Sequence, residues 1–136
     1  MRKKCEIGEI WLVAIPLLVK NSDNSFDTTF QMRPFLMIDE GKGVLVEENP
    51  DYLGVKITTK RNKLNKAKEI KNWKELGLNE KSYVRIEIPE RIEQTQLIAR
   101  IGILPRDQFM EIYREILNVF NIEVIQQLIE SEKEPV

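Results

Sequence analysis

The hydrophobic pattern of this chain changes its period at Pro105, and that change limits the folds the sequence can adopt. Before Pro105, apolar residues form short runs or alternate with polar ones, as they do in β-strands. After it, the apolar residues recur at helical spacing: Phe109, Met110, Tyr113, Ile116, Leu117 and Phe120. Asp107 stands near the start of this segment, where the helix dipole favours a negative charge. The sequence therefore predicts strands followed by a C-terminal helix.

The strand part divides at its turn residues. We expect strands over residues 9–19, 33–38, 44–47, 53–59, 82–89 and 97–104. Turn chemistry lies at 39–43 and 49–51, the polar stretch 20–32 reads as a loop, and a partly helical segment is expected around 64–73. Beyond Asn121, residues 122–129 continue as a second helical stretch.

Many short sequential strands before a helix indicate a mainly β fold. The pattern favours a strongly bent antiparallel sheet or a small barrel capped by the helix. The length of 136 residues suits one domain, so residues 1–136 are taken as a single unit with 121–136 as a C-terminal extension.

Two residue types restrict the chemistry. The chain contains no histidine, so histidine triads and histidine metal sites are excluded. Its one cysteine, Cys5, cannot form an intramolecular disulfide and is a poor start for a zinc site. A reducing compartment, the cytoplasm, is the simplest location.

The N-terminus superficially resembles a signal peptide, because three basic residues precede the apolar run 10–19. Glu6, Glu9 and Pro16 interrupt that pattern, and no small-residue cleavage site follows. The run is also shorter than the roughly 20 residues that span a bilayer. We expect a buried strand and no membrane association.

Positive charge gathers between Lys60 and Lys74, although the formal net charge is only −1. Seven of the residues in this segment are basic and only Glu69 opposes them: Lys60, Arg61, Lys63, Lys66, Lys68, Lys71 and Lys74. Such a segment is either a solvated loop or a surface that attracts a phosphate backbone.

Several motifs, in order, resemble those of PemK/MazF (Kid-like) toxins. These are Glu6-Ile7-Gly8-Glu9-Ile10-Trp11, Arg33-Pro34 before an apolar strand, Val55-Lys56-Ile57-Thr58-Thr59, Ser82-Tyr83-Val84-Arg85, and the strand 101–104 before a helix. The resemblance spans roughly residues 6 to 120. It implies a small SH3-like antiparallel barrel (PemK/MazF/CcdB-like) that forms a homodimer.

The resemblance also implies an activity, namely cleavage of single-stranded RNA without a metal or other cofactor. In this reaction the ribose 2′-hydroxyl attacks the adjacent phosphorus, so the protein must accept a proton, stabilise negative charge and assist the leaving oxygen. The implied partner is a cognate antitoxin whose disordered acidic segment folds into the substrate groove.

The matching positions define an expected site. Arg33 would bind the scissile phosphate with its fixed charge, and Thr58 would donate a hydrogen bond to a phosphate oxygen. RNA binding would involve Thr59 together with the basic residues Lys60, Arg61 and Lys63. The alternatives are a structural salt bridge for Arg33 and simple strand propensity for the threonines.

Arg85 and Glu87 stand two apart in an expected strand and so share a face. The resemblance gives Arg85 a phosphate-stabilising role and Glu87 the role of base, whereas an ordinary exposed ion pair is the alternative. The chain departs from the family in two places: Ile88 follows Glu87 where MazF-like toxins have glutamine, and the 20–32 segment lacks the histidine of Kid-like toxins.

Two other classes of function stay open. One is a noncatalytic relative on the same barrel that binds a protein or nucleic acid without cutting it. The other is an SH3-like binding module whose lysine segment docks on nucleic acid. Convergence of Arg33, Thr58, Arg85 and Glu87 in one groove would count against the binding module, whereas scattering of these side chains would support it.

Overall fold

A computed structural model describes residues 4–39, 52–60 and 67–119, except for the side chains at positions 87 and 88. In chain order the described elements are β1 (Glu9–Lys20), β2 (Phe26–Asp39), β3 (Tyr52–Thr58), β4 (Ala67–Glu69), β5 (Tyr83–Ile92), the short 3-10 helix η1 (Gln94–Gln96), β6 (Leu97–Ile103) and α1 (Arg106–Val119). The fold is mainly β with one C-terminal helix, as the sequence predicts.

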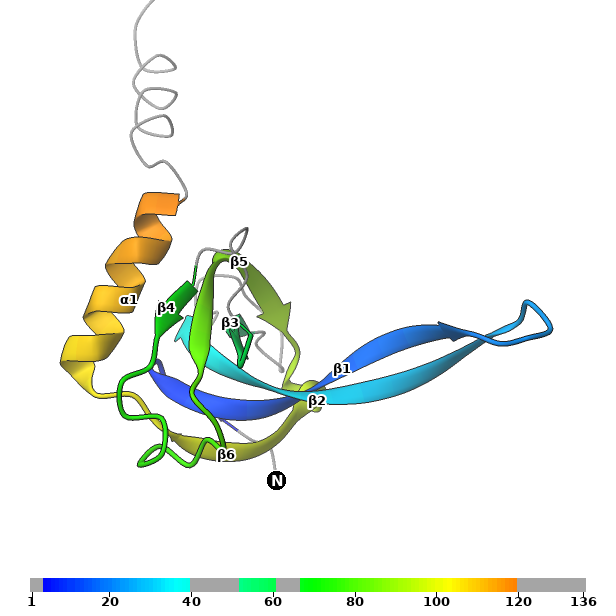
Figure 1. The fold of residues 1–136 in the computed structure, drawn as a ribbon, viewed down its shortest axis with the longest axis horizontal. Helices are drawn as coiled ribbons and strands as arrows, with labels where there is room; N and C mark the ends of the chain where they lie inside the picture. The colour runs from blue at the N-terminus through cyan, green and yellow to red at the C-terminus, as the bar shows by residue number, and fades with distance from the viewer. Residues whose placement is uncertain (1–3, 40–51, 61–66, 120–136) are drawn as a thin grey trace, which may run out of the picture.

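The strands form a single antiparallel sheet of order β4-β5-β3-β2-β1-β6. The sheet curls into a half-barrel, and α1 packs at the end opposite the projecting tip of β1 and β2 (Figure 1). β1 lies between β2 and β6 in its first half, which explains why its residues Ile10, Trp11 and Val13 are all buried.

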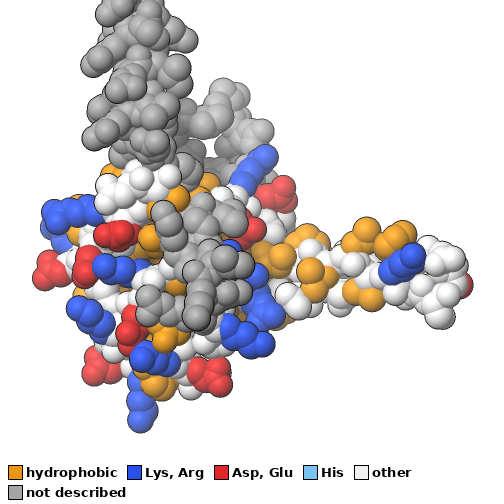
Figure 2. Space-filling view, turned by 45° about the horizontal axis from the view of Figure 1, so that its top comes forward, with side chains coloured by type: hydrophobic (Ala, Val, Ile, Leu, Met, Phe, Trp, Pro, Cys, Tyr) orange, Lys and Arg blue, Asp and Glu red, His pale blue; other side chains and the backbone are white. Residues whose placement is uncertain are grey.

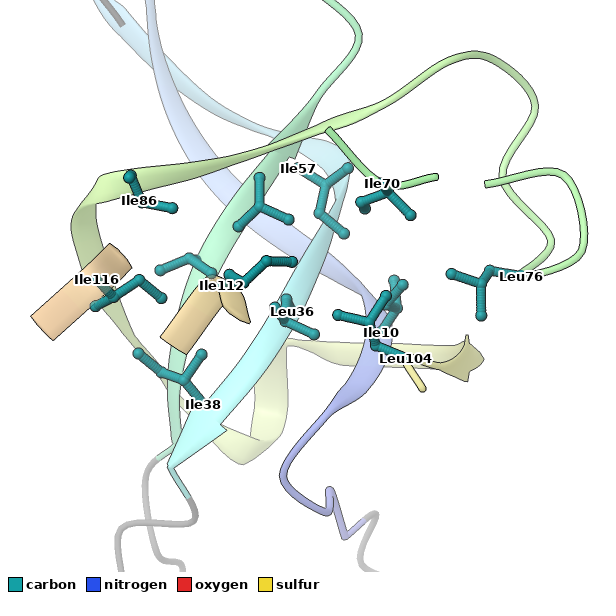
Figure 3. Packing of buried hydrophobic residues seen from close by; sticks show 12 residues of the cluster. Ile10, Leu36, Ile38, Ile57, Ile70, Leu76, Ile86, Leu104, Ile112 and Ile116 are labelled. Atoms are coloured by element: carbon teal, nitrogen blue, oxygen red, sulfur yellow. The ribbon is translucent and has the colours of Figure 1, made fainter. Parts of the chain in front are cut away.

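Buried side chains form one cluster on each face of the sheet. The cluster beneath α1 contains Ile10, Leu36, Ile38, Val55, Ile57, Ile70, Leu76, Val84, Ile86, Leu104, Ile112 and Ile116. Figure 3 shows Ile112 and Ile116 of α1 pointing toward the sheet residues of this cluster. Burying each of these two side chains contributes roughly 1.5–3 kcal/mol to the stability of the fold. The apolar residues that recur at helical spacing after Pro105 therefore include the residues that attach α1 to the sheet.

The second cluster lies on the other face and contains Cys5, Trp11, Val13, Phe35, Met37, Tyr52, Ile92 and Leu97. At its margin the buried carboxylate of Glu9 accepts hydrogen bonds from Trp11 Nε1 at 3.2 Å and from the Glu6 N–H at 2.6 Å. Arg100 of β6 lies 2.8 Å from the other Glu9 oxygen. These contacts satisfy a buried charge and connect β1 with β6.

Two sequence expectations about local structure are wrong. The stretch 20–32 is not all loop, because β2 begins at Phe26 and only the tip between β1 and β2 is a turn. Its polar composition hid an alternating pattern of larger apolar side chains at Phe26, Phe30 and Met32. Within the segment 64–73, residues Ala67–Glu69 form strand β4 rather than helix, because they pair with β5.

Some expectations fall on residues outside the described ranges. These are the strand at 44–47, the second helical stretch at 122–129 and the role of the extension 121–136. Within the described part of the chain, no helix combines the length and the apolar character needed to cross a membrane.

Candidate functional site

A groove of about 760 Å³ opens where β2 and β3 move apart. The residues lining it come from five parts of the chain: Leu12, Arg33, Pro34, Lys56, Ile57, Thr58, Thr59, Lys60, Gly77, Leu78, Asn79, Glu80, Ser82 and Ile101. Its volume lies within the range of about 300–1,000 Å³ that is usual for ligand sites. Four of the residues predicted from the sequence, Arg33, Thr58, Thr59 and Lys60, therefore line one groove.

The strand register explains why Arg33 and Thr58 meet. The last recorded pair between β2 and β3 at this end is Phe35 with Lys56. Counting two further residues along each antiparallel strand brings Arg33 opposite Thr58, on the same face of the sheet. The pairing of β2 with β3 stops before this point, and both residues line the groove together with residues of β1, β6 and the 77–82 segment.

Thr58 ends β3 with a side-chain turn. Its Oγ1 accepts the Lys60 N–H at 3.2 Å and lies 3.4 Å from the Lys60 carbonyl oxygen. This local bonding stops the strand and directs Thr59 and Lys60 along the rim. The contact to the carbonyl is long, so the hydroxyl hydrogen can turn toward a ligand oxygen.

The opposite wall follows a helical turn that ends at Gly77. The Leu78 N–H donates to the Trp73 carbonyl at 3.0 Å and the Gly77 N–H to the Lys74 carbonyl at 3.2 Å, which is a Schellman motif. Gly77 has φ +87°, a conformation that an L side chain rarely adopts. The motif turns the chain so that residues Leu78 and Glu80 enter the groove lining.

Two contacts hold this wall in place. The buried Ser82 hydroxyl donates to the Glu80 carbonyl oxygen at 2.8 Å, and the Ile70 N–H donates to the Ser82 carbonyl oxygen at 2.9 Å. On the other side the turn lies directly against β6, where a Cβ on Gly102 would stand 2.8 Å from the Leu76 carbonyl oxygen. Only glycine allows this close approach between two backbones.

The charges of the lining residues favour an anion. Arg33, Lys56 and Lys60 contribute three positive groups and Glu80 one negative group. Threonine hydroxyls and the Asn79 amide add hydrogen-bond donors. Apolar side chains, including Leu12 and Pro34, supply contact area for an uncharged part of the ligand.

Sequence reasoning assigned no role to Lys56, Glu80 or Ser82. Lys56 belongs to the motif Val55–Thr59 that resembles the toxin family. Because it stands two residues before Thr58 in the same strand, that motif could have indicated that Lys56 also lines the site. Glu80 and Ser82 line the same groove as Arg33 because β5 begins beside the end of β3. The local sequence around Glu80 contains no pattern that predicts its place in the same groove as Arg33.

Arg85 and Glu87 lie in β5, where the pairing with β3 is irregular. Val55 pairs with Pro89 but Ile57 pairs with Val84, so two steps along β3 correspond to five along β5. Arg85 pairs instead with Ala67 of β4, and it is not among the described residues that line the groove. The side chain of Glu87 lies outside the described part of the structure.

Two described members of the basic segment lie in different environments. Lys60 lines the groove, whereas Lys68 lies 3.0 Å from Glu111 of α1 and is engaged in an ion pair. The predicted RNA-binding residues Arg61 and Lys63 lie in the undescribed segment 61–66.

Other candidate chemistry is weaker in the described residues. Cys5 is buried, and burial followed by the nearby Glu9 charge raises the pKa of its thiol to about 12. It is therefore protonated near neutral pH and a poor nucleophile. Among residues 4–39, 52–60 and 67–119, no three metal-ligating side chains of histidine, cysteine, aspartate or glutamate come together.

Comparison with known proteins adds no assignment: no protein-family model matches the chain, and no curated protein matches it.

Proposed function

We propose that this chain is a metal-independent endoribonuclease toxin of a type II toxin-antitoxin system, acting on single-stranded RNA through the groove between β2 and β3. The observation that carries the proposal is the meeting of Arg33, Thr58 and Lys60 in that groove. Arg33 comes from β2, whereas Thr58 and Lys60 belong to one segment at the end of β3. The resemblance to PemK/MazF toxins gives these residues RNA-binding roles. The SH3-like barrel of that family belongs to the same proposal, and the curled antiparallel sheet with its C-terminal helix is compatible with it.

Arg33 is the residue best suited to the scissile phosphate. Its guanidinium stays charged, offers several donors in one plane and stands on the groove side of β2 opposite Thr58. Lys56 and Lys60 extend the positive lining on both sides of Thr58. Together they would neutralise the phosphate and stabilise the charge that develops on its oxygens during attack by the 2′-hydroxyl.

A carboxylate is needed to accept the 2′-hydroxyl proton. Glu80 lines the same groove as Arg33 and is therefore a candidate base on geometry. Glu87 is the candidate that the resemblance supplies; Arg85, which the resemblance places beside it as a phosphate-stabilising group, is not among the described residues that line the groove. Comparison of Glu80→Gln with Glu87→Gln separates the two, because the true base loses turnover while RNA affinity is kept.

The decisive experiment is incubation of the purified chain with a long single-stranded RNA in excess EDTA. We expect discrete fragments with 2′,3′-cyclic phosphate ends. Arg33→Ala should lower the cleavage rate by roughly 100-fold or more, the effect of removing one charge-stabilising donor. Arg114→Ala is the matched control, because Arg114 is an exposed residue of α1 that does not line the groove.

The same experiment distinguishes the noncatalytic alternative. If the folded chain binds the RNA, loses that binding in Arg33→Ala, and leaves the RNA intact, the groove belongs to a binding module. If Arg33→Ala cleaves as fast as the native chain, the groove is not the site of the reaction.

The implied partners follow from the same resemblance. A cognate antitoxin with a disordered acidic segment would be attracted by the three positive groups of the groove. A synthetic acidic peptide should therefore displace labelled RNA from the native chain. A homodimer and a cytoplasmic location also belong to the proposal.

A further inference from the structure

β1 and β2 extend beyond the rest of the sheet as a two-stranded arm, formed by residues 15–20 and 26–31. The recorded pairing of β1 with β6 ends at Val13, and that of β2 with β3 begins at Phe35. Between Ile15 and Lys20, the described partner of β1 is therefore β2. Figure 1 shows this arm projecting from the body of the molecule.

One face of the arm, together with the pair Ala14 and Met32 at its base, is largely apolar. The register pairs Ala14 with Met32, Pro16 with Phe30, Leu18 with Thr28, and Lys20 with Phe26, and all of these residues share a face because side chains alternate along a strand. The large apolar members are exposed: Leu18 by 69%, Phe30 by 61%, Phe26 by 56% and Met32 by 51%. Figure 2 shows hydrophobic side chains along the projecting arm.

Such an arm is poorly suited to water. A two-stranded hairpin without a third strand or a packed layer is at best marginally stable, and a contiguous exposed apolar face usually marks an interaction surface. We propose that this face is a dimerisation surface on which the arm of a second copy of this chain packs face to face about a twofold axis.

The charges argue for an apolar occupant. Lys20 is the one charged residue on this face, and Asp23 and Asp27 stand near the tip of the arm. Nucleic acid is held chiefly by clustered positive charge, which this face lacks. A second copy presents the same apolar side chains in return, as a twofold interface requires.

The area offered by these side chains fits a weak dimer. Two phenylalanines, one leucine and one methionine, each exposed by half or more, offer roughly 400 Å² per copy, and two copies roughly 800 Å². This total lies below the roughly 1,200 Å² at which standard specific interfaces begin, so we expect a concentration-dependent dimer. The dimer should therefore depend strongly on each large side chain.

Pro16 indicates that a second copy binds the apolar face of the arm and does not add a strand to the outer edge of β1. Proline has no N–H to donate, so a further strand cannot extend a regular ladder along that edge.

The test is sedimentation equilibrium of the full chain across a concentration series, which does not depend on the proposed ribonuclease activity. We expect a monomer–dimer equilibrium in the native chain. Leu18→Ser combined with Phe30→Ser should raise the dissociation constant by roughly 30-fold or more, as truncation of central interface residues does. Val19→Ser is the matched control, because Val19 is the next residue of the same strand, is 44% exposed and lies on the opposite face.

Circular dichroism of each variant establishes that it is folded, and no loss of fold is expected because the altered side chains are exposed. A native chain that sediments as a monomer at every concentration overturns the inference. So does a dimer that survives the double substitution, or one that Val19→Ser weakens equally.

Discussion

Replacing Gly102 with alanine should destabilise the chain by pushing the groove wall away from β6. A Cβ at this position would stand 2.8 Å from the Leu76 carbonyl oxygen, whereas ordinary contact begins at 3.4 Å, so the carbonyl must move by about 0.6 Å. The obstructing atom belongs to the backbone and cannot rotate away as a side-chain end could. The turn that carries Gly77 and Leu78 must shift with it.

The magnitude follows from two opposed effects. Overpacking of this kind costs typically about 1–3 kcal/mol. Alanine also reduces the freedom of the unfolded chain, which stabilises the native state by about 0.4–1 kcal/mol where the backbone is unstrained. The net loss in unfolding free energy is then about 1.5 kcal/mol, with a fall in melting temperature of roughly 5–8 °C.

Urea denaturation of the native chain and of Gly102→Ala measures this difference. Gly54→Ala is the control, because its nearest contact is the Ile92 side chain at 3.3 Å, which can adjust more easily than a backbone carbonyl. A Gly102→Ala chain as stable as the native one, or a larger loss in Gly54→Ala, would refute the reasoning. If the groove binds RNA, affinity should fall in Gly102→Ala and hold in Gly54→Ala.

Three further predictions concern other parts of the molecule. Ile112→Ala should lower the unfolding free energy by about 2–5 kcal/mol in urea denaturation, because it leaves a cavity beneath α1, whereas the exposed Met110→Ala should lose far less. Lys68→Met should raise the pKa of Glu111 toward 4.5 in an NMR titration, because the Lys68 hydrogen bond lowers it in the native chain. Since the folded pKa lies below the unfolded one, the pair stabilises the native state above the unfolded pKa and loses that effect as the pH falls, so the stability gap between native and variant should narrow in acid. Cys5 should resist iodoacetamide at pH 8 until the chain is denatured, because the thiol is buried and its pKa is raised to about 12; rapid labelling of the native chain would contradict this.

The strands and the helix could be predicted because each has its own local period. The apolar run from Ile10 predicts a strand, and the helical spacing after Pro105 predicts a helix. In both elements the buried residues lie close together in the sequence, so a local pattern reveals them. The sequence does not predict the arm, because polar turn residues around Asn21 and Ser25 dominate the composition of its segment. Phe26, Phe30 and Met32 do fall on alternate positions. These side chains are exposed and do not pack in the core, so burial does not require apolar residues at the positions between them and the pattern stays incomplete.

The candidate site could be predicted only in part, for a related reason. Arg33 and Thr58 belong to short motifs that resemble a known family, and the register of β2 with β3 then brings them together. Glu80 reaches the same groove through the turn ending at Gly77 and the start of β5. That proximity depends on contacts between distant segments, which local periodicity does not encode.

β1 and β6 pair in the sheet although they lie far apart in the sequence, and this pairing determines when the groove can form during synthesis. Glu9 pairs with Ile103, which follows 94 positions later, so the sheet closes at this edge through contacts of high contact order. A nascent chain that ends before β6 contains Arg33 and Thr58 but lacks Ile101 and the glycine against which the turn carrying Leu76 rests. Because such long-range pairing comes late, any activity that depends on the complete groove begins only after almost all of the described chain has been made.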